Sequence, residues 1–244
     1  MNHLGKIVVT AAAGLACAFS AASAADLPIK ADRYQPPILS AYNWTGLGLE
    51  GFGLYGVNFG GASTHDDLGL GLNDELSAHP HGPGVGGGFW YFYQPSPGGI
   101  VFGMRAEIAY ANLQSGASSN LGIVPLSVSN ATNFLGDVDA CLGLSLSADG
   151  RLLGYGCGGF GFGGAKPNLQ VASLQAAASD TSTGYNAALG LKYALTPNWI
   201  VGIEGDYFKL GDRQLTATIG GTPVVTSNTK YDIFVQKFTI GYKF

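Results

Sequence analysis

The chain has 244 residues, of which 12 are Lys or Arg and 16 are Asp or Glu, so its formal net charge is −4 at pH 7. Only 11% of the residues are charged, against about 25% in an ordinary soluble domain, while 39 residues are Gly and the mean hydropathy is +0.20. This balance excludes a basic surface for nucleic acid and a disordered tail, and it favours one β-rich domain over a helical enzyme.

The first 24 residues predict a secretory signal peptide. Lys6 precedes an apolar stretch that runs from Ile7 to Ala22, and Ala22-Ser23-Ala24 supplies the small-x-small pattern of a cleavage site. The apolar stretch is too short for a helix that spans a membrane. We therefore expect residues 1–24 to be removed.

The mature chain is expected to begin with an extended segment, residues 25–41, which is rich in Pro and has no period. Cys17 offers an alternative lipoprotein site, but Gly14 stands three residues before it, where such sites generally carry Leu. Residues 42–244 carry the pattern of a folded domain.

Eight segments of this domain alternate apolar residues with small or polar ones. Side chains of a β-strand point to opposite faces in turn, so this period of two predicts strands with two different surroundings. The predicted strands are Tyr42–Val57, Gly84–Tyr93, Gly99–Leu113, Asn133–Ser147, Arg151–Gly164, Gly184–Leu195, Trp199–Gly211 and Lys230–Phe244.

The connections between these strands alternate in length. Three are short turns, at residues 94–98, 148–150 and 196–198, and the other four hold roughly 26, 19, 19 and 18 residues. An even number of strands with short turns on one side and long loops on the other predicts an eight-stranded, antiparallel transmembrane barrel. Residues 214–219 and 224–227 also alternate, which leaves ten strands as an alternative and predicts that the last hairpin stands above the membrane.

The two faces of the predicted strands differ in charge. Between residues 100 and 110, Arg105 and Glu107 lie on one face, and Ile100, Phe102, Met104, Ile108 and Tyr110 lie on the other. A charge facing lipid at the middle of a membrane costs about 2 to 4 kcal/mol, so the charged face is expected to line the lumen. A soluble β-sandwich, the alternative, needs many charges on its outer face. Trp44, Trp90 and Trp199 are interpreted as aromatic girdle residues at the membrane interfaces.

The inward faces supply the candidate functional residues. An eight-stranded barrel is only wide enough for its own side chains, so we expect an ion network that fills the lumen. A carboxylate pair acting on a lipid is the enzymatic alternative, but no G-x-S-x-G occurs and no His lies in a strand, so we expect neither an enzyme nor a cofactor. The predicted network is Glu50, Arg105, Glu107, Asp137, Asp139, Lys192, Glu204, Asp206 and Lys237.

Cys141 and Cys157 are the two cysteines of the predicted mature chain. They lie eight residues before and eight residues after Asp149, in the predicted turn at Asp149 and Gly150. A tight hairpin places them opposite or one step diagonal, so a disulfide is expected if their Cα atoms lie about 5.5 Å apart in an oxidising compartment. Two buried thiols are the alternative.

The first long connection gathers imidazoles and carboxylates within 17 residues. These groups bind Zn²⁺ or Cu²⁺, and histidines bind haem iron, although the spacing matches no known site. A solvated polar loop is the alternative interpretation. The candidate ligands are His65, Asp66, Asp67, His79 and His81.

Four segments carry a family resemblance: residues 25–28 (ADLP), 43–46 (NWTG), 190–199 (GLKYALTPNW) and 241–244 (GYKF). They resemble the small outer-membrane β-barrel family of porin-like, opacity-type surface antigens of Gram-negative bacteria. The resemblance implies an eight-stranded up-and-down barrel in the bacterial outer membrane, surrounded by lipids and lipopolysaccharide, with periplasmic termini. It also implies that Phe244 is part of the signal read by the barrel-assembly machinery.

The chain departs from this family in its lumen. Asp139 and Cys141 stand where the family usually has basic residues, and Cys157 stands where a Thr is common. A transport preference is therefore not carried over. We expect a structural or surface-antigen role with a filled lumen, and the alternatives are a narrow diffusion channel, capture of metal or haem by the loops, and a lipid-modifying enzyme.

Overall fold

The computed structural model describes residues 41–60, 62–66, 79–96, 98–121, 124–171, 174–177, 180–219 and 222–244. No helix among these residues is long and apolar enough to cross a membrane. The strands are β1 (Gly46–Asn58), β2 (Ala62–Asp66), β3 (His81–Tyr93), β4 (Ile100–Leu121), β5 (Val124–Ser145), β6 (Leu152–Val171), β7 (Leu174–Ala177), β8 (Asp180–Ala194), β9 (Trp199–Ile219) and β10 (Thr222–Lys243).

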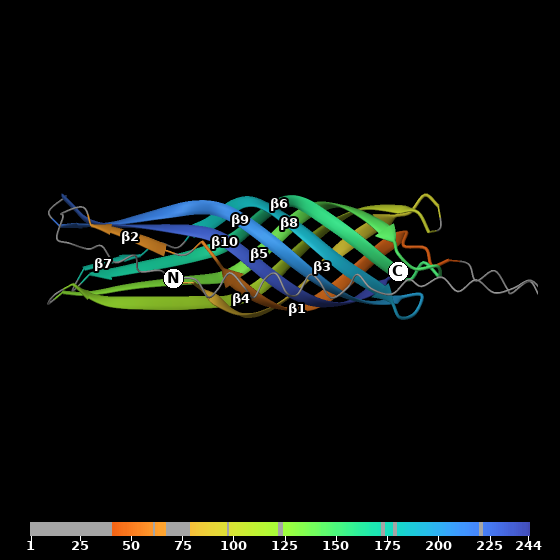
Figure 1. The fold of residues 1–244 in the computed structure, drawn as a ribbon, viewed down its shortest axis with the longest axis horizontal. Coiled ribbons are helices and arrows are strands. Elements are labelled where there is room, and N and C mark those ends of the chain that lie inside the picture. Colours follow the sequence, from red (N-terminus) through yellow and green to blue (C-terminus); the bar gives the residue numbers. More distant parts are fainter. Residues whose placement is uncertain are drawn as a thin grey trace, which may run out of the picture. The chain divides into compact units, whose positions relative to one another are not determined.

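Eight of these strands close into a barrel in the order β1-β3-β4-β5-β6-β8-β9-β10, and β10 pairs with β1 (Figure 1). Every pairing in the ring is antiparallel. The short strands β2 and β7 pair with β10 and β6 outside the ring. The prediction of an eight-stranded antiparallel barrel is confirmed. The ten-stranded alternative is wrong, because residues 214–219 and 224–227 lengthen β9 and β10 and add no strand to the ring, and β2 and β7 pair outside it.

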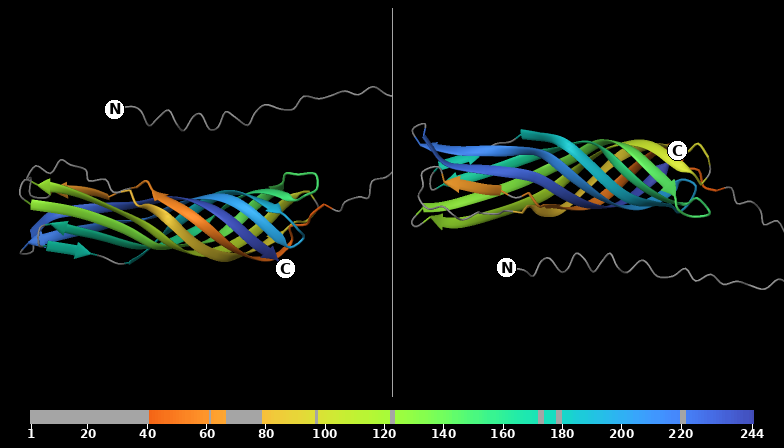
Figure 2. Two further views of the ribbon diagram at one scale, coloured as in Figure 1. Left: turned by 90° about the horizontal axis from the view of Figure 1, so that it is seen from below. Right: turned by 45° about the horizontal axis from the view of Figure 1, so that its top comes forward.

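The strands are longer than predicted at one end of the barrel, which we call the hairpin end (Figure 2). β4 and β5 pair as far as Leu121 and Val124, and β9 and β10 pair as far as Ile219 and Thr222. In β4 and β5 the predicted strands stop earlier because small and polar residues occupy both faces of residues 115–120, so the apolar alternation fades while the backbone ladder continues. In β9 and β10 the alternating residues 214–219 and 224–227 extend the two strands of the ring. The opposite end carries the short turns and is called the turn end.

The alternation of the strands is confirmed as an alternation of exposure. In β4, Phe102 is 50% exposed whereas Val101 is 1% exposed, and Met104 is exposed whereas Arg105 is buried. The same pattern in β9 buries Glu204 and Asp206 and exposes Ile203 and Tyr207. The exposed face forms an apolar belt around the barrel, and the charged face points inward.

Two of the three tryptophans lie inside the barrel, so their interpretation as girdle residues is wrong. Trp44 is 0% exposed and Trp90 is 1% exposed. Trp90 enters the lumen because Gly48, its partner on β1, has no side chain, and a Cβ atom there would overlap the indole ring. Trp199, by contrast, is 48% exposed on the outer face, and its ring packs edge-on against Tyr242.

Candidate functional site: the barrel lumen

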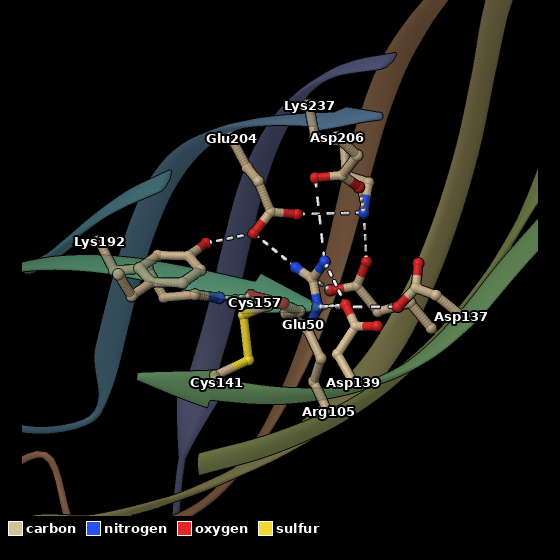
Figure 3. A network of polar contacts seen from close by, with 12 residues as sticks. Glu50, Arg105, Asp137, Asp139, Cys141, Cys157, Lys192, Glu204, Asp206 and Lys237 are labelled. Carbon is tan, nitrogen blue, oxygen red and sulfur yellow. Dashed lines mark hydrogen bonds and ion pairs between the residues drawn. A yellow bond between two sulfur atoms is a disulfide. The ribbon is translucent and has the colours of Figure 1, made fainter. Parts of the chain in front are cut away.

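Register brings the charged residues of the lumen together. The pairing of β4 with β5 sets Arg105 opposite Asp139 and Glu107 opposite Asp137, and the pairing of β9 with β10 sets Lys237 opposite Glu204. All nine residues predicted for the ion network are at most 7% exposed. We call these nine residues the lumen network (Figure 3).

Arg105 is the first centre of the lumen network. Its guanidinium lies 2.8 Å from Asp139 Oδ2 and 2.5 Å from Glu204 Oε2. Three further carboxylates lie within 4 Å of it, namely Glu107 at 3.5 Å, Asp137 at 3.6 Å and Asp206 at 3.9 Å. One cation thus contacts carboxylates from β4, β5 and β9.

Lys237 is the second centre. Its ammonium pairs with Glu107 and Asp206 and lies 3.1 Å from Glu204 Oε1. It also lies 4.9 Å from the centre of the Phe52 ring, a distance at which a cation and an aromatic face attract each other. Lys237 and Arg105 share three carboxylates, so the loss of either cation disturbs the partners of the other.

A third cation, Lys192, pairs with Glu50 and lies 5.7 Å and 5.6 Å from the rings of Trp90 and Tyr155. Two uncharged residues that the sequence prediction missed join the network. The Tyr155 hydroxyl donates to Glu204 at 2.5 Å, and the Asn186 amide donates to Asp139 at 2.9 Å. Their inward position in the alternation of β6 and β8 was the signal that marked them.

The lumen network contains six carboxylates and three cations. Glu107, Asp137 and Asp206 each offer an oxygen within 4.8 Å of the others, which is the spacing of a metal site. The Lys237 ammonium already contacts two of these three carboxylates, so it takes the position that a metal cation would occupy. The arrangement therefore fits an internal ion network better than a metal centre.

Apolar side chains fill the lumen on both sides of the lumen network. The hairpin-side apolar cluster is built on Phe52, Leu113, Leu135, Phe208, Tyr231 and Ile233. The turn-side apolar cluster is built on Trp44, Trp90, Phe92, Leu153, Tyr155 and Ile200. Between the network and the hairpin-side cluster lies a cavity of about 10 Å³, which is the space of a single water molecule.

The segment before β1 covers the turn end of the lumen. The Trp44 backbone N–H donates to Gln94 Oε1 at 2.9 Å, and its indole N–H donates to Gly150 O at 2.8 Å. The Tyr42 N–H donates to Asp149 O, and the Tyr42 hydroxyl donates to Pro197 O. The segment is thus tied to each of the turns that close this end of the barrel.

Cys141 and Cys157 lie directly opposite each other on β5 and β6. A disulfide joins them, and their Cα atoms lie 4.1 Å apart, closer than the spacing of about 5.5 Å on which the sequence prediction rested. Both side chains point inward and belong to the turn-side apolar cluster.

The candidate metal ligands of the first long connection are only partly described. His65 and Asp66 lie in β2, but their side chains, like Asp67, lie outside the described part of the chain. The exposed His81 places its Nδ1 atom 3.1 Å from the His79 carbonyl oxygen. Binding of metal or haem by this connection stays a prediction.

Phe244, the predicted assembly signal, lies at the turn end beside β1. Its backbone N–H donates to Leu47 O at 2.9 Å, and its ring is 67% exposed. The ring packs edge-on against Tyr242, with 5.3 Å between the ring centres. The role of Phe244 in assembly stays a prediction.

Comparisons with known proteins identify this architecture. The family model described as "Outer membrane protein beta-barrel domain" matches residues 10–244. A search of curated proteins finds no match.

Solved structures similar to this one include small outer-membrane barrels. OprG from Pseudomonas aeruginosa is 13% identical, with 84% of this chain and 98% of OprG covered and a TM-score of 0.51. Ail, the attachment invasion locus protein of Yersinia pestis, is 17% identical, with 82% and 99% covered and a TM-score of 0.40. AlkL, determined by solid-state NMR in lipid bilayers, is 17% identical, with 91% and 97% covered and a TM-score of 0.43. At such identities the likeness to OprG shows the fold alone.

Proposed function

The chain belongs to the family of outer membrane protein β-barrel domains, and on this premise we propose that it is a non-conducting structural protein whose outer hairpins serve a surface role. The family places it in the outer membrane of a Gram-negative bacterium. In outer-membrane β-barrels the short turns face the periplasm and the longer connections face the outside of the cell. The turn end is therefore periplasmic and the hairpin end is external.

The observation that carries this proposal is the filled lumen. The lumen network lies between two apolar clusters, so an ion that enters from either end meets tightly packed apolar side chains first. Behind them, each of the three cations of the lumen network is paired with a carboxylate. A diffusion channel would need a continuous polar lining, and the apolar clusters interrupt it.

Single-channel recording tests the closed lumen. The mature protein is refolded, its folding is checked by the mobility of unboiled and boiled samples on a gel, and it is inserted into a planar bilayer. We expect no conductance steps under conditions in which a water-filled porin gives them. Reproducible steps from folded protein would establish the narrow-channel alternative.

The surface role rests on the length of the external hairpins. β4 and β5 continue past Leu113 to Leu121 and Val124, while the outward apolar side chains end near Tyr110. An epitope inserted between Leu121 and Val124 is expected to bind antibody on intact cells, and the same epitope at the Asp149 turn is expected to bind only after lysis. Equal labelling at both positions would contradict the orientation.

We also propose two kinds of partner. Outer-membrane lipids and lipopolysaccharide contact the apolar belt, and the barrel-assembly machinery recognises Phe244. Deletion of Phe244 is expected to lower the amount of assembled barrel in cells, whereas Phe244→Trp, which keeps a terminal aromatic ring, is expected to preserve it. No catalytic role is proposed, because the lumen carboxylates are engaged by buried cations.

A further inference from the structure

We propose that a thiol-oxidising protein of the periplasm joins Cys141 to Cys157 before the barrel closes, so that the chain inserts with one hairpin already cross-linked. The proposal uses the outer-membrane location of the family and does not depend on whether the finished lumen conducts. Three facts support this order of events: the two sulfurs are buried in the finished barrel, the two cysteines are close in the sequence, and thiol–disulfide exchange requires direct contact between sulfurs.

The two sulfurs are enclosed in the finished barrel. Cys141 is 7% exposed and Cys157 is 8% exposed, and both point into the lumen. On the periplasmic side, Trp44, Leu153 and Tyr155 are at most 6% exposed and belong to the same apolar cluster.

The external side and the barrel wall are closed as well. Asp139, which the Arg105 guanidinium contacts, is the next inward residue of β5 above Cys141. The outward neighbour of the cysteine, Leu142, belongs to the apolar belt. Thiol–disulfide exchange requires the attacking and attacked sulfurs to touch, so a protein oxidant cannot reach this pair once the barrel has closed.

The cysteines can meet earlier because the hairpin that joins them is local. They are 16 residues apart in the sequence. The turn between them is held by contacts within a few residues: Gly150 takes a φ of +74°, the Ser147 hydroxyl donates to Asp149 at 2.6 Å, and the Leu152 N–H donates to the Ser147 hydroxyl. A positive φ suits Gly and hairpin turns, so these local contacts favour the turn before Tyr42 and Trp44 pack against it.

The oxidation is a two-electron exchange with the disulfide of the oxidant. One cysteine thiolate attacks that disulfide, forms a mixed disulfide and releases one oxidant sulfur as a thiolate. The second cysteine thiolate attacks this chain's sulfur in the mixed disulfide, the bond between Cys141 and Cys157 forms, and the second oxidant sulfur leaves. The oxidant is reduced to a dithiol, which takes up the two protons that the cysteine thiols lose.

Early oxidation has a structural consequence, because it fixes the register of β5 on β6. Cys141 lies directly opposite Cys157, and this register puts Asp139 on the inward face. A slip of one residue would turn every side chain of a strand to its other face, which would place a carboxylate against lipid. The cross-link therefore selects the hairpin that the lumen network requires.

The test compares oxidation of the unfolded and the folded chain. Reduced mature protein is treated with an oxidised periplasmic-type dithiol oxidase, either in urea or after refolding into detergent, and free thiols are counted by a mass-adding maleimide after denaturation. We expect the unfolded chain to be oxidised at least about tenfold faster than the folded one, since access controls exchange. Equal rates would overturn the proposal.

Two further measurements keep the test decisive if the reduced chain does not fold. Barrel folded from oxidised chain is exposed to a bulky protein reductant, and we expect its disulfide to resist reduction until urea is added. In the variant Cys157→Ala, the remaining Cys141 thiol reports access directly, and we expect maleimide to label it only in the unfolded protein. Rapid reduction or labelling of the folded barrel would show that Cys141 and Cys157 are accessible there. It would thereby refute the proposal that they are oxidised before the barrel closes.

Discussion

Replacement of Lys237 by Met is expected to destabilise the barrel far more than removal of an exposed cation. Met keeps an unbranched side chain of similar length, so the change removes the charge and leaves most of the packing. In the parent protein the ammonium pairs with Glu107, Glu204 and Asp206. Without it, two cations face six buried carboxylates.

The magnitude follows from the burial of these groups. Removing one partner of a buried ion pair costs about 3 to 5 kcal/mol, because it leaves an uncompensated charge away from water. With a urea dependence near 2 kcal/mol per molar, a loss of this size lowers the midpoint of unfolding by roughly 2 M. Fluorescence of the buried Trp44 and Trp90 follows the transition in detergent.

Lys209→Met is the matched control. Lys209 pairs with Asp232 at 2.7 Å, but its side chain is 43% exposed, and exposed pairs contribute about 0 to 1 kcal/mol. Adding Asp206→Asn to Lys237→Met is expected to restore part of the stability, because it removes one of the buried carboxylates that have lost their ion pair with Lys237. If Lys237→Met loses no more stability than Lys209→Met, the lumen network does not stabilise the barrel in this way.

The remaining predictions concern the periplasmic cover, the apolar belt and one turn. Trp44→Ala removes a fully buried side chain and is expected to cost about 3 to 5 kcal/mol in urea unfolding, yet to leave bilayer recordings silent because the layers above stay in place. Val138→Arg puts a cation on the lipid face near mid-barrel and is expected to cost about 2 to 4 kcal/mol, whereas Val138→Leu has little effect. The Ser147 hydroxyl and the Arg151 N–H donate to Asp149 and hold its pKa below the usual value of 3.8, so Ser147→Ala is expected to raise the midpoint of the Asp149 carboxyl signal in an NMR titration.

The lumen was the most predictable part of this protein because lipid imposes a strict rule. A strand that crosses a membrane cannot turn a charge outward cheaply, so alternation alone assigned Arg105, Glu204 and Lys237 to the interior. Above the membrane both faces of a hairpin contact water, so polar side chains are tolerated on either face. The extension of β4 and β5 to Leu121 and Val124 therefore has no apolar alternation from which a strand could be predicted.

Uncharged residues of the site were harder to predict. Aromatic side chains suit both a membrane interface and a packed lumen, so Trp90 was misplaced, although Gly48 on the neighbouring strand leaves the space that it fills. Tyr155 and Asn186 are uncharged, so the cost of a charge in lipid does not assign them to the lumen. Only their position in the alternation of β6 and β8 indicates that they point inward. Partners across a barrel depend on register and shear, which composition does not encode.

The contact between the two ends of the barrel chain has a consequence for its topology. Lys243 donates to the Asn43 carbonyl, and Phe244 donates to Leu47, so the first and last strands meet where the chain enters and leaves. A short peptide linker could join these ends without crossing the barrel. The chain can then be cut open at the external tip between β9 and β10 instead, and the circular permutant is expected to rebuild the same ring from a different starting strand.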